Sequence, residues 1–200
     1  MFTKKSLCYT TLALTSSIGF SSDPFFFQSP TFEGSGCPSD SVQIITASDF
    51  QTVSVLFSEY SAATSSKSTF DRKSCNLAVP VDIAPGYSMG IVKVDYRGYV
   101  FAPKKSSEAD FMAEYFFAGI KGPVVKEEYT KYQDDIYVSN DVGIASVVWS
   151  DCGSSTIFRI NTSIMARKDS SDDEDVFITI DTTDMTVTNA FTYYVTTKKC

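Results

Sequence analysis

The sequence predicts an all-β fold, namely an antiparallel, jelly-roll-like β-sandwich with two disulfides. Apolar residues recur at every second position in many short segments, as strands with one buried face require. Turn signals separate these segments, and no long segment has the helical period. Four cysteines divide the chain almost evenly after an N-terminal leader: Cys37, Cys75, Cys152 and Cys200.

The alternating segments predict the strands in chain order. They are residues 53–57, 75–83, 92–96, 111–117, 158–164, 176–180 and 191–195. The clearest is 75–83, although Pro80 within it cannot donate a ladder hydrogen bond, so we expect an edge or a bulge there. Turns are expected at residues 84–86, 102–103, 119–123 and 152–155, and a solvated acidic loop at 169–175.

The first 22 residues predict a secretory signal peptide. Lys4 and Lys5 precede a short apolar stretch and then small residues, and the stretch falls short of the roughly 20 residues that a spanning helix needs. Residues 23–200 then form one domain. Cys8 leaves with the leader, so an even number of cysteines remains, as expected in an oxidising compartment. We therefore expect a secreted, extracellular protein without stable membrane insertion.

The four remaining cysteines allow three disulfide connectivities. Pairing Cys37 with Cys75 and Cys152 with Cys200 closes the shorter loops, which is the only reason to prefer it. None of these thiols belongs to a C-x-x-C pair, and the chain has no histidine, so neither a zinc site nor a redox motif is expected.

The absence of histidine restricts the chemistry. It excludes Ser-His-Asp and Cys-His nucleophiles as well as histidine-bound copper and zinc. A net charge of −7 without a basic stripe disfavours nucleic acid as a partner. The acidic loop at 169–175 lacks the ordered spacing of a calcium loop, so no metal and no cofactor are predicted. Glycoside hydrolysis needs only two carboxylates, but nothing singles out a pair among Glu59, Asp95, Glu114, Glu127, Glu128, Asp134 and Asp135.

Three residues are candidates for ligand binding. Arg97 and Tyr99 belong to the densest cluster of polar and aromatic residues, and with Trp149 they could form a platform for sugar rings or for a partner's side chains. The competing interpretation is structural, with Arg97 paired to Asp95 and Trp149 packed beside a disulfide. Asn161 begins an Asn-Thr-Ser sequon on an outward-facing strand position and is a candidate for N-glycosylation.

Five motifs occur together in this chain. They are Gly-Ser-Gly-Cys-Pro-Ser at 34–39, Asp-Arg-Lys-Ser-Cys-Asn-Leu at 71–77, Val-Asp-Tyr-Arg-Gly-Tyr at 94–99, Val-Trp-Ser-Asp-Cys-Gly at 148–153 and the final Lys-Lys-Cys. In this order they resemble the domain of unknown function family 4360, small secreted proteins mainly of fungi without an assigned activity. The resemblance implies a secreted β-rich domain with the four cysteines oxidised, and it implies no catalytic residue.

The sequence therefore predicts a secreted, non-catalytic protein that acts by binding at a cell surface, a cell wall or a host interface. Its partner is expected to be an extracellular glycan or, if the protein is effector-like, another protein. The alternatives are a secreted glycoside hydrolase that uses a carboxylate pair and a structural component of the cell wall.

Overall fold

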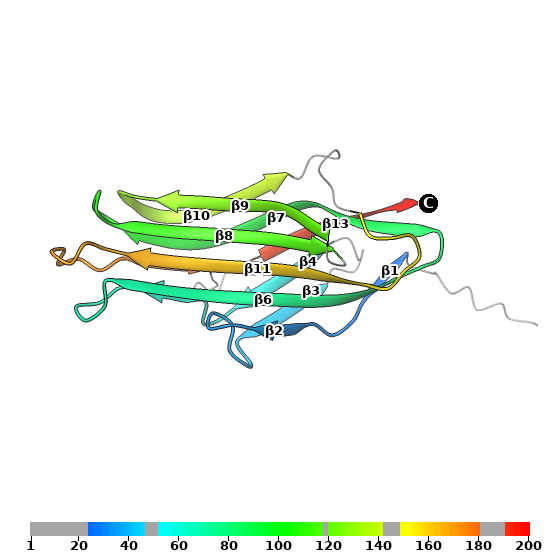
Figure 1. Ribbon diagram of the computed structural model, residues 1–200, viewed down its shortest axis with the longest axis horizontal. Coiled ribbons are helices and arrows are strands. Elements are labelled where there is room, and N and C mark those ends of the chain that lie inside the picture. The colour runs from blue at the N-terminus through cyan, green and yellow to red at the C-terminus, as the bar shows by residue number, and fades with distance from the viewer. Residues whose placement is uncertain (1–23, 47–51, 118–119, 142–148, 181–190) are drawn as a thin grey trace, which may run out of the picture.

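Two antiparallel β-sheets pack face to face in the computed structural model, which describes residues 24–46, 52–117, 120–141, 149–180 and 191–200 (Figure 1). One sheet has six strands in the order β1-β6-β11-β8-β9, with β2 beside β1 along β6. Its strands are β1 (Phe25–Phe27), β2 (Thr31–Glu33), β6 (Phe70–Ile83), β8 (Glu108–Phe117), β9 (Ile120–Tyr129) and β11 (Thr156–Arg167).

The other sheet has seven strands in the order β3-β4-β13-β7-β12-β5, and β10 pairs with the free side of β7. Its strands are β3 (Val42–Thr46), β4 (Thr52–Phe57), β5 (Ser61–Ala63), β7 (Tyr87–Ala102), β10 (Tyr132–Asp141), β12 (Phe177–Ile180) and β13 (Phe191–Lys199). From β6 to β12 the chain crosses between the sheets at every connection except the one that joins β8 to β9. The predicted jelly-roll-like sandwich is confirmed.

The long strand β7 organises the seven-stranded sheet. On one side it pairs with β10, and on the other side it pairs first with β13 and then with β12. The register with β13 shifts so that Tyr194 lies opposite Lys93 and Val195 opposite Ile91, which leaves Val92 as a bulge. Met89 and Ile91 are buried before this bulge and Val94 and Tyr96 after it. The bulge therefore moves the buried face from odd to even positions, and the simple alternation predicted for 92–96 is interrupted at its first residue.

The core lies between the inner faces of the two sheets. Leu77, Val79 and Val81 of β6 are buried, as the alternation in 75–83 predicts. Across the interface the rings of Tyr96 and Phe111 lie 4.6 Å apart between centroids, so β7 and β8 interlock. Such interdigitated side chains from both sheets are what holds a sandwich together.

Two predictions about prolines need correction. Pro80 lies neither on an edge strand nor in a bulge, because β6 pairs with β11 on one side and with β1 and β2 on the other. The Pro80 carbonyl accepts a hydrogen bond from Gln28 in the gap between β1 and β2, where no ladder partner needs a proline N–H. The turn predicted at 119–123 is wrong at its end, since Gly122 and Pro123 lie inside the edge strand β9.

The predicted two disulfides are present, and they join Cys37 to Cys75 and Cys152 to Cys200 with sequence separations of 38 and 48. Both sulfurs of the first bond belong to residues that are 2 % exposed, whereas Cys152 and Cys200 are both exposed. The predicted signal peptide lies outside the described residues. Within the described part of the chain, no helix has the length and apolar character to span a membrane.

Candidate functional site

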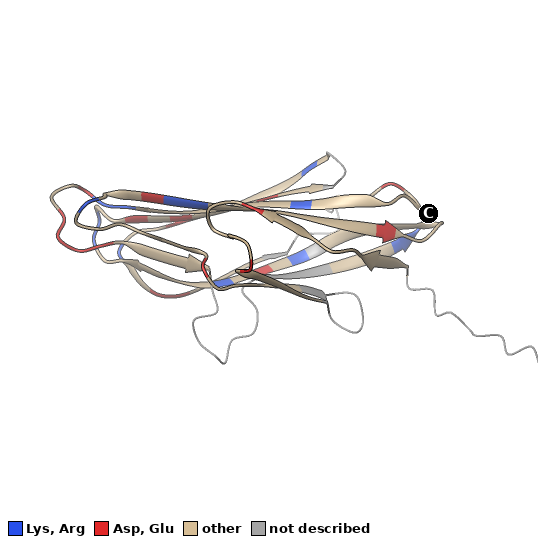
Figure 2. Cartoon of the chain, turned by 90° about the horizontal axis from the view of Figure 1, so that it is seen from below, with Lys and Arg blue, Asp and Glu red and all other residues tan. Residues whose placement is uncertain are grey.

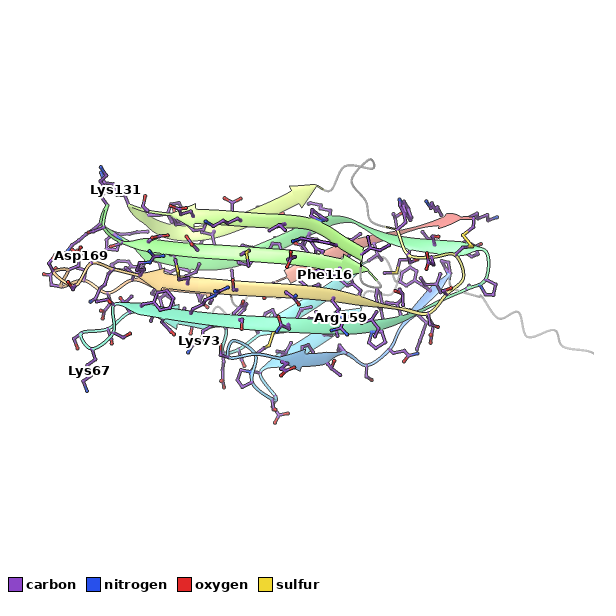
Figure 3. The ribbon with its side chains drawn as sticks, viewed as in Figure 1. Lys67, Lys73, Phe116, Lys131, Arg159 and Asp169 are labelled. Carbon is purple, nitrogen blue, oxygen red and sulfur yellow. A yellow bond between two sulfur atoms is a disulfide. The ribbon has the colours of Figure 1, made fainter. Side chains whose placement is uncertain are left out.

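A groove opens along the edge where the two sheets part. The edge strands β9 and β10 follow one another in the chain, and the turn between them includes Lys131, whose backbone φ is 53° (Figures 1 and 3). Side chains from both strands surround an open cavity of about 330 Å³. This tyrosine groove is lined by Glu127, Tyr129, Tyr132, Ile136, Tyr137, Val138 and Ser139.

The alternation of the two edge strands supplies the lining. Val125 of β9 is buried, so Glu127 and Tyr129 point from the same side of that strand toward the opposite sheet. On β10, Ile136 and Val138 are 3 % and 7 % exposed and provide the apolar wall. The groove thus combines a buried apolar wall with polar and aromatic side chains at its mouth, which is the composition of small-molecule sites.

The tyrosines give the groove its chemistry. The rings of Tyr129 and Tyr132 lie 5.1 Å apart at an interplanar angle of 51°, and the Tyr132 hydroxyl donates a hydrogen bond to the Asp135 carbonyl at 2.9 Å. Burial, together with the nearby Glu127 carboxylate and Tyr132, raises the pKa of Tyr129 to about 12. Its phenol therefore stays neutral at physiological pH and keeps its O–H as a hydrogen-bond donor.

The candidate residues Arg97 and Tyr99 lie next to the groove on the outer face of β7. The Arg97 guanidinium carbon lies 5.4 Å from the centre of the Tyr137 ring, and Tyr137 itself lines the groove. Tyr99 is 36 % exposed one strand position further along. Asp95 does not pair with Arg97 as expected, because it accepts a hydrogen bond from Ser139 at 2.7 Å and lies 3.1 Å from the Lys93 ammonium.

Trp149 lies at the other end of β7. It forms an isolated bridge with Gly90, nine residues before Tyr99, which corresponds to a distance of about 30 Å along an extended strand. The Lys198 ammonium lies 4.2 Å from the centre of its ring, and Cys152 follows three residues later. The structure therefore does not bring Trp149 into one platform with Arg97 and Tyr99, and a role for it in binding stays a prediction.

Asn161 occupies the outer face of the six-stranded sheet. It lies in β11 opposite Asn76 on one side and Glu114 on the other, and its side chain is half-buried. The expected outward orientation is therefore present, while glycosylation at this position stays a prediction.

Three carboxylates meet at another place on that outer face. Glu108, Asp110 and Glu128 each place one oxygen within 4.8 Å of the others. Burial, followed by the charges of Glu108 and Glu128, raises the pKa of Asp110. Carboxyl groups in a retaining glycosidase stand about 5–5.5 Å apart on either side of a bound sugar, and no cavity among the described residues borders this trio.

The acidic loop has structural partners. Asp172, Asp173 and Glu174 surround the Lys104 ammonium at 3.4, 2.6 and 3.4 Å, and Asp175 lies 2.7 Å from the Lys168 ammonium. Figure 2 shows these charges at one end of the sandwich. The hydrogen bond to Asp173 raises the pKa of Lys104 well above its usual range. The loop acids thus neutralise lysines, which the sequence analysis did not foresee.

Sequence reasoning missed the groove, since it assigned no strand to residues 120–141. A signal was present, because Ile136 and Val138 alternate with Tyr137 and Ser139 in the pattern of a strand with one buried face. Glu127 appeared only as one of several carboxylates. Among the residues that line the groove it is the single carboxylate, so the pair needed for glycoside hydrolysis is not present there.

Comparisons with known proteins give three findings. A family model described as "Domain of unknown function (DUF4360)" matches residues 25–200. An "Uncharacterized secreted protein" of Arthroderma benhamiae is 27% identical over 146 residues, which are 67% of this chain and 56% of the relative, so the chain spans just over half of that protein's length. Secretion and the predicted family resemblance are confirmed.

A solved structure is also similar to this chain. It is TmCBM61 in complex with β-1,4-galactotriose, with a TM-score of 0.33, 13% identity, and coverage of 84% of this chain and 88% of that chain. Superposition at this TM-score is only partial. The ligand of that protein therefore carries no argument about the ligand of this one.

Proposed function

We propose that this chain, which belongs to the DUF4360 family, is a secreted non-catalytic protein that binds a glycan in its tyrosine groove. The observation that carries the proposal is the groove itself, where three tyrosines, Glu127 and Ser139 surround a cavity of about 330 Å³ beside an apolar wall. Cavities that hold small ligands begin at about this size. A single carboxylate among the lining residues favours binding over hydrolysis.

Glycans suit this lining for chemical reasons. A sugar ring presents C–H groups on its faces and hydroxyls around its rim, so it needs an apolar surface and hydrogen-bonding groups side by side. Tyr129, Tyr132 and Tyr137 each provide both, because a tyrosine joins a flat apolar ring to a polar hydroxyl. Glu127 and Ser139 add further acceptors for sugar hydroxyls.

Arg97 and Tyr99 extend the proposed surface beyond the groove. Arg97 contacts the Tyr137 ring, and Tyr99 is partly exposed on the same outer face. A glycan longer than the groove would continue over these two residues. On this proposal they contribute less than the groove tyrosines, since they lie on an open face where water competes for each contact.

An array of soluble and insoluble glycans tests the proposal, followed by calorimetry on the glycans that retain the protein. The Tyr137→Ala variant should bind about tenfold more weakly, because an exposed aromatic ring in a binding site is an energetic anchor. Tyr137 is 55% exposed, so its loss should leave the melting temperature almost unchanged. Phe26→Ala is the matched control, since Phe26 is 61% exposed on the other sheet, and it should bind like the wild type.

Two results would contradict the proposal. The first is a blank array for the wild-type protein, in particular if a stoichiometric protein partner is recovered from extracellular fluid instead. The second is equal loss of binding in the Tyr137→Ala and Phe26→Ala variants, which would place the site outside the groove.

A further inference from the structure

We infer that the glycan of the tyrosine groove carries free, protonated amino groups, so that its building block is an amino sugar. This inference rests on the proposed function and adds the chemical class of the ligand. It comes from the charge and the surroundings of Glu127.

Glu127 is the only charged side chain among the residues that line the groove. Within the described part of the chain, no lysine or arginine nitrogen lies within 4.0 Å of its carboxylate. The neighbouring Glu128, by contrast, lies 3.7 Å from the Lys126 ammonium on the other side of β9. The groove therefore offers an exposed carboxylate without a cation of the protein beside it, and a ligand cation can form a charge-assisted hydrogen bond there.

The rings around Glu127 favour the same ligand. Cations are attracted to the faces of aromatic rings, and Tyr129 and Tyr132 lie beside each other in the groove. The charge of Glu127 is felt at the Tyr129 hydroxyl, where it contributes with burial to a raised pKa. The field at this end of the groove is thus negative.

The rest of the molecule points in the same direction. The chain carries a net charge of −7, and the nearby Asp134 and Asp135 on β10 are exposed. A glycan with carboxylate, sulfate or phosphate groups would be repelled at long range. A neutral glycan would leave the Glu127 carboxylate without a charged partner. An amino sugar satisfies the rings and the carboxylate together.

Calorimetry with three tetrasaccharides of one linkage tests this. They are the β-1,4-linked tetramers of glucosamine, of N-acetylglucosamine and of glucose, which differ only in the substituent on the second carbon. At low ionic strength the glucosamine tetramer should bind about tenfold more tightly than the other two, because a cation and a carboxylate then form a hydrogen-bonded pair. Added salt should reduce this preference.

Two variants locate the effect. Glu127→Gln should lower the affinity for the glucosamine tetramer about tenfold and leave the glucose tetramer within about twofold. Glu128→Gln removes the same charge from the next residue on the outer face, so it should leave both affinities within about twofold. The pair of variants separates contact with the groove from a change in net charge.

Different failures have different meanings. Equal binding of the three tetramers, or equal effects of Glu127→Gln and Glu128→Gln, would overturn the amino-sugar inference and leave the proposed glycan site intact. Binding of none of the tetramers, together with a blank glycan array, would overturn the proposed function as well. If tetralysine binds as tightly as the glucosamine tetramer and depends equally on Glu127, the groove recognises cationic peptides and the amino-sugar inference is wrong.

Discussion

The two disulfides close loops of similar length but belong to very different surroundings. Cys37 and Cys75 are buried, and the Cys75 carbonyl accepts a hydrogen bond from the Thr162 hydroxyl, which in turn accepts one from Tyr60. Cys152 and Cys200 are exposed, and the Cys200 N–H donates to the Gly86 carbonyl in a surface turn. The first bond is thus part of the core, while the second ties segments together from outside.

The difference teaches that loop entropy alone does not rank these bonds. In the chain-entropy model each is worth about 4 kcal/mol, since the loop lengths enter only as a logarithm. What differs is how much packing and hydrogen bonding depends on the bond. Removal of the buried disulfide should disturb the contacts between the sheets, and removal of the exposed one should leave them in place.

The largest effect is expected from removing each disulfide in turn. Cys37→Ala/Cys75→Ala should destabilise the protein by more than about 4 kcal/mol, because lost packing adds to the loop entropy. Cys152→Ala/Cys200→Ala should cost about 4 kcal/mol or less. Urea unfolding measures both values. In the wild type, alkylation after brief reduction should modify Cys152 and Cys200 first, and faster modification of the buried pair would contradict the comparison.

A smaller contrast is expected between two glycines. A Cβ on Gly36 would lie 2.3 Å from ring atoms of the buried Tyr60, so Gly36→Ala should destabilise by about 1–3 kcal/mol. Gly86 beside the exposed disulfide has a φ of +83° and nothing within 4 Å of such a Cβ. Gly86→Ala should therefore cost only the backbone strain, about 1 kcal/mol. Thermal unfolding of both variants gives the order, and a reversed order would refute the difference in packing.

The smallest contrast concerns single side-chain contacts. Tyr60→Phe removes the hydroxyl that donates to Thr162 at 2.9 Å in the core and should cost about 1 kcal/mol. Lys198→Gln removes the ammonium above the Trp149 ring at the exposed disulfide and should cost about 0.5 kcal/mol, with less effect at high salt. Denaturant titrations at two salt concentrations measure both. A salt-dependent loss in Tyr60→Phe would argue against a neutral, buried contact.

The sequence contained much of this architecture. Leu77, Val79 and Val81 alternate cleanly enough to identify β6 and its buried face. The alternation failed at Val92, because a bulge depends on the register with β13, about a hundred residues away in the chain. Gly122 and Pro123 suggested a turn, since the sequence does not tell that β9 is an edge strand where proline is tolerated.

The candidate site was harder to predict. Composition alone pointed to Arg97 and Tyr99, which lie beside the groove, and to Trp149, which lies far from it. The groove itself exists because the last strands of two different sheets open along one edge, and no local pattern encodes that arrangement. In the motif that begins at residue 34, Gly36 has a packing role, because the chain passes there against the ring of Tyr60.

The alternation of the chain between the two sheets sets how quickly the protein can fold. The hydrogen bond from Thr162 to the Cys75 carbonyl joins residues 87 positions apart, and β7 pairs with β13 over a similar span. Sandwiches built from such distant pairings fold on the scale of milliseconds to seconds, because long loops must close before contacts form. Until β11 arrives, β6 has an open side that can pair with another chain. Crowding in the secretory pathway should therefore be most dangerous to this protein before its second half has been made.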